Sequence, residues 1–303
     1  MTIKAHRRKV VIEIKGGLGN QMFQYAAART LSLELGADLL VESKLGFFLD
    51  WEYRRKFELN ELPTVFSTST LVDSYPFYTD RVRTLLNRGV GFKSKRRLPR
   101  NFLFERNFSY IDLSNLDRDT ERFWMSGYFQ DPRYFESYRE TVLSELTPPL
   151  PSEPNYLELA KLSESFNLIA LGIRIFEESS APGVHARNGT NKTLTDFQSV
   201  LSSLLDTVLN PKLLVFTTKE FDFLKLMNFP IDTVFVNSDR GFHGSVNKLW
   251  LLSRCQHHIF NNSTFYWWGA TLSEANFRNE EQQIYCSDNF LNPDILYPNW
   301  NKF

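Results

Sequence analysis

The chain has few cysteines, no net charge and no long hydrophobic run. Two cysteines in 303 residues are too few for a disulfide framework or a Cys-based zinc cluster, so Cys255 and Cys286 are expected to be small buried hydrophobes in a reducing cytosol. The 35 basic and 35 acidic residues balance, so net charge gives no reason to expect nucleic acid. No apolar stretch approaches the roughly 20 residues of a membrane-spanning helix. The absences favour a cytoplasmic globular protein.

Hydrophobic and aromatic residues are plentiful. They make up 42% and 15% of the chain, which excludes a disordered or fibrous protein. The aromatic excess fits a sugar-binding cleft, but it fits a well-filled core better. The first apolar run, at 10–14, contains Glu13 and predicts a strand rather than a signal peptide. The length is about twice that of a usual domain of roughly 150 residues, so two domains are expected.

The N-terminal half begins with a strand, a glycine-rich loop at 16–20, a helix and a second strand. The helix is expected to end at Gly36, the usual C-terminal capping residue. A later helix is expected to use Asp131 as its N-cap. The expected elements are strands at 10–14, 37–42 and 123–129 and helices at 21–36 and 131–146. The strand–helix–strand start predicts a parallel sheet.

A proline-rich stretch at 147–155, with four prolines in nine residues, predicts the domain boundary. The resulting domains are 1–150 and 151–303. Strands and helices alternate beyond the boundary, which predicts a doubly wound α/β domain. The strands are expected at 167–175, 212–218, 232–237, 257–262 and 282–288, and the helices at 195–209, 219–227, 245–255 and 265–276.

The string Gly-Gly-Leu-Gly-Asn-Gln at 16–21 joins the first strand to the first helix. Gly17 and Gly19 would let a ligand approach the backbone, and Asn20, Gln21 and the free N–H groups of the helix start could bind an anion or a hydroxyl. These four residues are therefore candidates for binding the sugar donor. The spacing matches neither the dinucleotide motif nor the ATP-binding motif. On the glycines alone, a ligand loop and a tight turn without a ligand remain equally good interpretations.

A second candidate site follows the strand expected at 257–262. Asn262, Ser263 and Thr264 precede Phe265 at the start of an aromatic helix. Small hydroxyl residues at such a turn can cap the helix and donate hydrogen bonds to phosphate oxygens. A helix cap followed by core tryptophans accounts for part of the same pattern.

Arg174 lies at the end of the first strand after the linker. A guanidinium there can bind a diphosphate through two parallel hydrogen bonds. From this segment alone, an ion pair between the domains is the better interpretation.

No metal site is expected. His257 and His258 are adjacent in a strand and would point to opposite faces, so one of them should be buried and hydrogen-bonded. No obvious carboxylate pair lies beside a strand end, where Mg²⁺ would need it.

Together, several strings resemble the bacterial α-1,2-fucosyltransferase family, glycosyltransferase family 11. They are KGGLGNQMFQYAAARTLS at 15–32, WMSGYFQDPRYF at 124–135, LSRCQHHIFNNSTFYWWGATLSE at 252–274 and the closing DNFLNPDILYPNW at 288–300. The resemblance implies a GT-B fold, with two Rossmann-like lobes and a cleft between them. It further implies an N-terminal acceptor lobe and a C-terminal donor lobe. The implied reaction is a metal-independent, inverting transfer of L-fucose from GDP-fucose, α-1,2 to a galactoside in an oligosaccharide.

Two strings depart from the family's pattern where the donor is expected. The family's His-x-Arg-Arg-Gly-Asp is here Gly172-Ile173-Arg174-Ile175-Phe176-Glu177. Arg174 keeps the first arginine and Glu177 the acidic position, whereas the histidine and the second arginine are lost. The family's Phe-Ser-Asp-Asp is replaced by Phe216-Thr217-Thr218-Lys219. The sequence therefore supports the fold and sugar transfer better than it supports GDP-fucose.

The expected mechanism places Arg174 on the leaving diphosphate, because negative charge grows there as the acceptor hydroxyl attacks. Ser263 and Thr264 are its expected helpers. Glu177 is the candidate general base, although a solvated loop carboxylate is an equally good interpretation. His185 and Arg187 lie in a glycine-bearing loop that could close over the donor.

Three functions compete. A fucosyltransferase comes first, a transferase with a different nucleotide sugar second, and a catalytically reduced carbohydrate-binding descendant third. Each would bind a nucleotide sugar or a glycan. No cofactor is expected, and the GDP-sugar is the donor substrate.

Residues 81–106 carry nine Lys or Arg and one acidic residue. A basic cluster interleaved with Leu and Phe can lie on an anionic membrane surface. That would place the protein peripherally at the inner face of the cell membrane and would suit an acceptor built on a lipid carrier. The alternative is a solvated charged face, and nucleic acid fits less well because no binding motif accompanies the charge.

Overall fold

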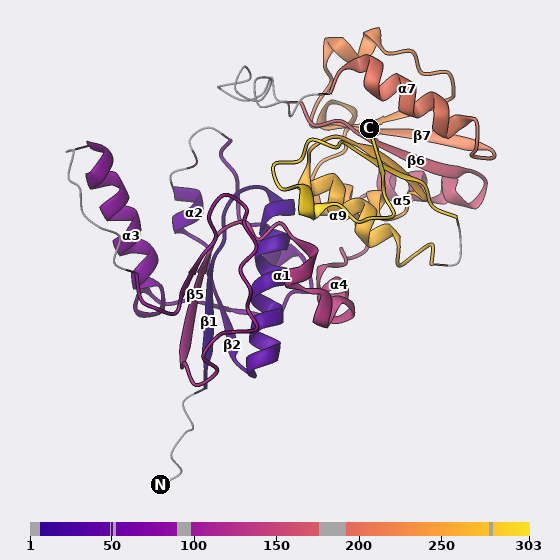
Figure 1. The fold of residues 1–303 in the computed structure, drawn as a ribbon. Helices are drawn as coiled ribbons and strands as arrows, with labels where there is room; N and C mark the ends of the chain where they lie inside the picture. The colour runs from indigo at the N-terminus through magenta and orange to yellow at the C-terminus, as the bar shows by residue number, and fades with distance from the viewer. Residues whose placement is uncertain (1–6, 49, 51–52, 90–97, 176–191, 279–280) are drawn as a thin grey trace. The chain divides into compact units, whose positions relative to one another are not determined.

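The computed structural model divides the chain into two compact units, Met1–Leu146 and Thr147–Phe303. It describes residues 7–48, 50, 53–89, 98–175, 192–278 and 281–303, with 87–89 and 223 described by backbone alone. Each unit is built on one parallel sheet with helices against it (Figure 1).

The first unit holds a five-stranded sheet in the order β3-β2-β1-β5-β4. Every paired strand in it is parallel. The strands are β1 (Lys9–Glu13), β2 (Asp38–Glu42), β3 (Ser67–Thr68), β4 (Phe102–Phe104) and β5 (Arg122–Ser126). The helices are α1 (Leu18–Leu35), α2 (Leu45–Phe48), α3 (Leu71–Gly89) and α4 (Arg139–Leu146), with 3-10 turns η1 (Leu59–Glu61), η2 (Pro132–Tyr134) and η3 (Glu136–Tyr138).

Helices cover both faces of this sheet. Figure 1 shows α1 and α4 on one face and α3 on the other. Arg29 of α1 forms a two-pronged ion pair with Glu145 of α4, which also accepts a hydrogen bond from Tyr25 at 2.6 Å. On the opposite face Phe77 of α3 packs with Val11 and Trp124 of the sheet. Both faces are thus buried, as parallel sheets require.

Three expectations for this unit were wrong in detail. The first helix begins at Leu18 rather than 21, because Gly16 takes a left-handed φ of 80° and Gly17 serves as N-cap. The strand expected at 123–129 stops at Ser126.

The third concerns the helix expected at 131–146, which is two 3-10 turns followed by α4. Phe135, with φ −130°, interrupts it, because its buried ring packs toward Phe23 at 6.4 Å. Asp131 does cap the first turn, accepting from the Arg133 N–H at 3.0 Å.

The second unit holds a six-stranded parallel sheet in the order β11-β10-β9-β6-β7-β8. Its strands are β6 (Asn167–Gly172), β7 (Pro211–Phe216), β8 (Thr233–Val236), β9 (His257–Phe260), β10 (Ile284–Cys286) and β11 (Asn301–Lys302). Its helices are α5 (Pro154–Lys161), α7 (Leu194–Leu205), α8 (Ser245–Leu252) and α9 (Thr264–Ser273), with 3-10 turns η4 (Leu162–Glu164), η6 (Asp222–Leu226), η7 (Ser238–Arg240) and η8 (Pro293–Ile295).

The order in which strands are added to this sheet reverses between β6 and β9. From β6 the chain moves outward through α7 to β7 and β8, and from β9 it moves the other way through α9 to β10. In Figure 1, α7 lies on one face of the sheet, and α5 and α9 lie on the other. Such a reversal opens a crevice at the carboxyl ends of the two central strands, which is where open α/β sheets bind ligands.

One helix expected for the second unit was wrong, and one short strand was not expected. The helix expected at 219–227 is the short 3-10 turn η6, because Met227 is extended and Pro230 follows. The closing strand β11, only two residues long, has no sequence signal.

Aromatic residues of the second unit form a connected cluster under α9. Trp267 stacks on Tyr297 at a centroid distance of 5.4 Å and lies 5.6 Å from Trp300, which in turn meets Phe260 at 5.7 Å. The Trp267 indole N–H donates to the Ile295 carbonyl at 2.8 Å. The Trp-Trp-Gly string at 267–269 and the closing segment at 288–300 therefore pack together in one core.

Both cysteines are buried and unpaired. No helix in the described part of the chain is long and apolar enough to cross a membrane.

Candidate functional site

The carboxyl ends of β6 and β9 form the first candidate site. Gly172 pairs with Phe260 at the end of the two strands, so the segments that follow run side by side. Asn261 is buried and holds Arg174 by its backbone. Its side-chain oxygen accepts from the Arg174 N–H at 2.7 Å, and its side-chain N–H donates to the Arg174 carbonyl at 2.8 Å. Two predicted features, Arg174 and the turn after β9, are thus brought together.

The turn itself leads directly into α9. Asn262 donates to the Asn289 carbonyl at 3.2 Å, which ties the turn to the closing segment. Ser263 is the N-cap residue, but its hydroxyl makes no capping hydrogen bond. Thr264 and Phe265 form the first turn of the helix and, like Ser263, are partly exposed. A helix start of this kind directs N–H groups toward an anion.

The lost family histidine has a structural explanation in Tyr266. A Cβ atom on Gly172 would lie 2.5 Å from Cγ of the Tyr266 ring, so no side chain fits there while the ring is in place. The Tyr266 hydroxyl donates to the Phe216 carbonyl at 2.9 Å and contacts the Ile173 carbonyl at 3.4 Å, so it ties α9 to the ends of β7 and β6. The position of the second arginine is also closed, because Ile175 is buried in a hydrophobic cluster with Phe197 of α7.

The polar groups of the other altered string, at 216–219, form hydrogen bonds within the second unit. Thr217 is buried, and its hydroxyl donates to the Lys219 carbonyl at 2.8 Å, while Ser238 donates to the Thr218 carbonyl at 2.9 Å. Glu177, the candidate base, lies outside the described residues, as do His185 and Arg187.

The carboxyl edge of the first unit forms the second candidate site. Gly16 and Gly17 make the turn there, whereas Gly19, Asn20 and Gln21 lie in the first turns of α1. A Cβ atom on Gly17 would lie 2.1 Å from a guanidinium nitrogen of Arg55, so the absence of a side chain leaves room for that cation. Asn20 accepts a hydrogen bond from Gln130, after β5, at 2.9 Å.

Two glutamines of α1 hold the same loop by its backbone. Gln21 is fully buried, donates to the carbonyls of Gly16 and Lys56, and accepts from the Glu58 N–H. Gln24 accepts from the Lys15 N–H at 2.9 Å and donates to the Lys15 carbonyl at 3.2 Å. The side chain of Gln21 is therefore occupied within the protein and serves the fold rather than a ligand.

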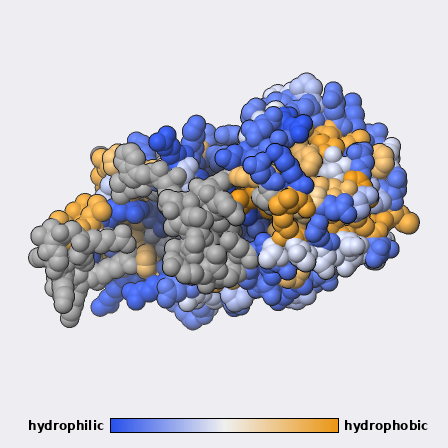
Figure 2. Space-filling model, turned by 90° about the horizontal axis from the view of Figure 1, so that it is seen from above, coloured by the Kyte–Doolittle hydropathy of each residue, from blue (hydrophilic) through white to orange (hydrophobic). Residues whose placement is uncertain are grey.

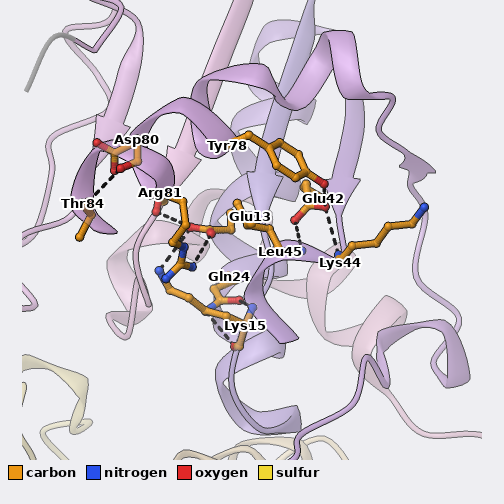
Figure 3. Close-up of polar contacts among 11 residues, drawn as sticks. Glu13, Lys15, Gln24, Glu42, Lys44, Leu45, Tyr78, Asp80, Arg81 and Thr84 are labelled. Carbon is orange, nitrogen blue, oxygen red and sulfur yellow. Dashed lines mark hydrogen bonds and ion pairs between the residues drawn. The ribbon is translucent and has the colours of Figure 1, made fainter. Parts of the chain in front are cut away.

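The end of β1 carries a carboxylate surrounded by cations, drawn in Figure 3. Glu13, 5% exposed, accepts from Arg81 of α3 at 3.1 Å and from the Ser126 hydroxyl at 2.7 Å, and Lys15 lies 3.5 Å away. Burial alone would raise the pKa of Glu13, but Lys15, Ser126 and Arg81 together outweigh it and lower the pKa. Glu13 is thus an ionised hydrogen-bond acceptor, and its low basicity makes it a poor proton acceptor.

Glu105, just after β4, holds the loop that follows β5. One of its carboxylate oxygens accepts from the Tyr128 and Phe129 N–H groups at 2.6 and 2.9 Å. The other is buried, with no hydrogen-bond partner among the described residues. Burial raises the pKa of Glu105 even though the two N–H groups favour its ionised form. The loop so held places the Tyr128 ring 5.5 Å from the Lys15 ammonium.

Sequence reasoning found Glu13 in its strand but gave it no role, and it missed Lys15, Arg81 and Glu105. The signal for Glu13 was a carboxylate inside an apolar run. Arg81 and Glu105 gave none, because their partners lie 68 and 23 or 24 residues away.

The two histidines of β9 are structural. His257 accepts from the Gln283 N–H at 3.0 Å, and His258 bonds to the Cys255 carbonyl at 3.0 Å. Burial lowers the pKa of His257 to about 4 and that of His258 to about 3. Within the described ranges, no group of three or more His, Cys, Asp or Glu side chains could hold a metal ion.

A cavity of about 470 Å³ lies in the first unit against the second half of α1, lined by Thr30, Glu34, Tyr110, Arg118 and Tyr138 among others. The carboxyl edge lies at the start of α1, so this cavity belongs to the other end of the helix. We assign it no part in the chemistry.

Comparison with known proteins adds to this geometry. No protein-family model matches the chain. The O-antigen biosynthesis glycosyltransferase WbnK of Escherichia coli is 29% identical over 278 residues, which are 86% of this chain and 89% of that protein. An α-1,2-colitosyltransferase of Escherichia coli is 24% identical over 271 residues, 87% of each chain.

Solved structures match over most of the chain. The α-1,6-fucosyltransferase NodZ, co-crystallised with GDP, has 14% identity and a TM-score of 0.51, covering 88% of this chain and 92% of that one. NodZ from Bradyrhizobium in a second structure gives 14% identity and a TM-score of 0.50, with the same coverage. The chain has the GT-B fold. Together with the two Escherichia coli relatives, the fold supports the interpretation of the protein as a glycosyltransferase.

We predict that Glu13→Gln destabilises the first unit by about 2 kcal/mol at pH 7, because it removes charge-assisted hydrogen bonds from a buried position. The folded-state pKa of Glu13 is below its ordinary value, so its stabilisation is complete above about pH 4.5 and is lost as the pH falls through the lowered value. The difference from the unchanged protein should therefore shrink in acid. Urea unfolding at several pH values measures it, with the exposed Glu121→Gln as control. A difference independent of pH would contradict the assignment.

We predict that Gly172→Ala costs about 1 to 3 kcal/mol of unfolding free energy, because the new methyl group meets the Tyr266 ring. The double variant with Tyr266→Ala should lose less than the sum of the two single changes, since the ring is gone. Urea unfolding of all four proteins completes the cycle. Strict additivity would show that the two positions do not compete for the same space.

Proposed function

We propose that the protein is an inverting, metal-independent glycosyltransferase that moves L-fucose from GDP-fucose onto a galactoside of an oligosaccharide, forming an α-1,2 linkage. The observation that carries the proposal is the pairing of Arg174 with the turn before α9 at the carboxyl ends of β6 and β9. The family resemblance and the names of the two Escherichia coli relatives support sugar transfer in glycan synthesis.

The proposed donor site is the carboxyl edge of the second unit. Arg174 meets the diphosphate, and Asn262, Ser263, Thr264 and Phe265 bring N–H groups and hydroxyls to the same place. As the acceptor hydroxyl attacks the anomeric carbon, the bond to the diphosphate breaks and negative charge grows on the leaving oxygen. Fixed donors at that oxygen lower the barrier without the aid of a cofactor.

The first unit would hold the acceptor at its own carboxyl edge. Gly17, Gly19 and Asn20, which the sequence made candidates for donor binding, border that edge, and the Lys15 ammonium beside the buried Glu13 offers a charged donor to sugar hydroxyls. Because Glu13 is held ionised by its cations, we do not assign it the role of general base. Glu177 stays our candidate for the proton of the attacking hydroxyl.

A different nucleotide sugar is the second candidate. Gly172 and Ile175 replace two donor-side residues of the family pattern, and the structure closes both positions, with Tyr266 and with the core. One of the relatives is itself named a colitosyltransferase rather than a fucosyltransferase. A changed donor pocket is the simplest physical consequence of these replacements.

The function is tested by incubating the purified protein with a panel of nucleotide sugars and a galactoside acceptor, with product detected by mass spectrometry. We expect transfer from GDP-fucose that survives EDTA. Transfer from another donor alone would select the second candidate. Activity lost in EDTA and restored by Mg²⁺ or Mn²⁺ would exclude the metal-independent mechanism, and binding without turnover of any donor would indicate a carbohydrate-binding descendant.

We predict that Arg174→Ala lowers turnover at saturating donor by about a hundredfold, on the order of 3 kcal/mol of transition-state stabilisation. The control is Arg254→Ala, which removes an exposed arginine of the same unit and should leave turnover unchanged. Near-normal turnover of a folded Arg174→Ala protein would return Arg174 to a structural role.

A further inference from the structure

Helix α3 has an apolar face that points away from its own sheet. Six large hydrophobic residues of this helix are between 47% and 73% exposed: Leu71, Val72, Tyr75, Val82, Leu85 and Leu86. With a step of about 100° per residue, five of them fall in one sector of about 100°, and Val72 borders it. We call these six residues the outward face of α3. Figure 2 shows hydrophobic surface at the end of the first unit where α3 lies.

The opposite side of α3 is the one that the fold uses. Asp73 pairs with Lys9 at 2.9 Å, and Phe77 is buried against the sheet. At the margin of the outward face, Tyr78 donates to Glu42 at 3.2 Å and Arg81 donates to Glu13 at 3.1 Å, as Figure 3 shows. The second half of α3 therefore lies beside the carboxyl edge of the first unit, and the outward face is not needed to hold the helix in place.

An exposed apolar stripe on an amphipathic helix marks a binding surface rather than a solvated one. The charge of the sequence around it indicates the kind of partner. Residues 81–106 carry nine Lys or Arg and one acidic residue in a chain whose net charge is zero. That acidic residue, Glu105, is buried and bound to backbone N–H groups. Even with Arg81 engaged by Glu13, the segment keeps a strong positive excess.

We propose that the outward face of α3 binds an anionic membrane surface. Apolar side chains on one side of a helix, with cations next to them in the sequence, match the acyl boundary and the anionic headgroups of a bilayer. Attachment would hold the carboxyl edge of the first unit close to the lipid, where an acceptor on a lipid carrier would be within reach. The proposal does not depend on which sugar is transferred.

Vesicle co-sedimentation of the full chain tests this. We expect binding to vesicles that contain phosphatidylglycerol, little binding to pure phosphatidylcholine, and release at high salt because surface charges are then screened. Val82→Glu/Leu85→Glu should reduce the bound fraction roughly tenfold or more, since binding scales with the apolar area buried. The matched control is Leu209→Glu/Leu226→Glu, which adds the same charge at two exposed leucines of the second unit, 82% and 76% exposed, and should bind like the unchanged protein.

Circular dichroism and the urea midpoint establish that both double variants are folded. Failure of the unchanged protein to bind anionic vesicles at low salt would overturn the proposal, as would an equal loss in the control variant. A protein that ignores vesicles but changes from dimer to monomer with Val82→Glu/Leu85→Glu would show that the outward face binds a second copy instead.

Discussion

Buried amide side chains that hold a cationic residue by its backbone are the constraint on which both candidate sites depend. Asn261 exchanges two hydrogen bonds with the backbone of Arg174, and Gln24 does the same with Lys15. In each unit the cation stands two residues beyond the end of a central strand, β6 or β1. A loop held this way keeps its charged side chain at the carboxyl edge, because the backbone cannot rotate without leaving a buried amide unsatisfied.

Hydrogen bonds of this kind give much of the sequence that resembles the family a role in the fold. The glutamines of the first string fix the glycine loop, and the string after β5 meets that loop through Gln130 and Asn20. In the second unit, the tryptophans of α9 form one aromatic core with the closing segment. Long shared strings thus record packing as well as chemistry, and Arg174 with the turn before α9 is the portion that we propose to face a ligand.

The sequence could predict the parts of the structure that depend on short-range patterns. Apolar runs gave the main strands, and Gly36 gave the end of α1, although the helix begins three residues before its expected start. Pairings across long separations had no such signal: Arg81 with Glu13, and Glu105 with the loop after β5. The reason for Gly172 could not be read from the sequence either, because the Tyr266 ring, which lies 94 positions along the chain, fills the space that a side chain would need. Phe135 interrupts an expected helix because the packing of its ring in the core outweighs the local helix propensity.

A crystal structure of the full chain with a bound nucleoside diphosphate tests the central claim most directly. The account predicts that the diphosphate lies at the carboxyl ends of β6 and β9, within hydrogen-bonding distance of the Arg174 guanidinium and of the 262–265 turn, while Asn261 keeps both bonds to the Arg174 backbone. A diphosphate bound at the carboxyl edge of the first unit, or away from Arg174, would contradict it.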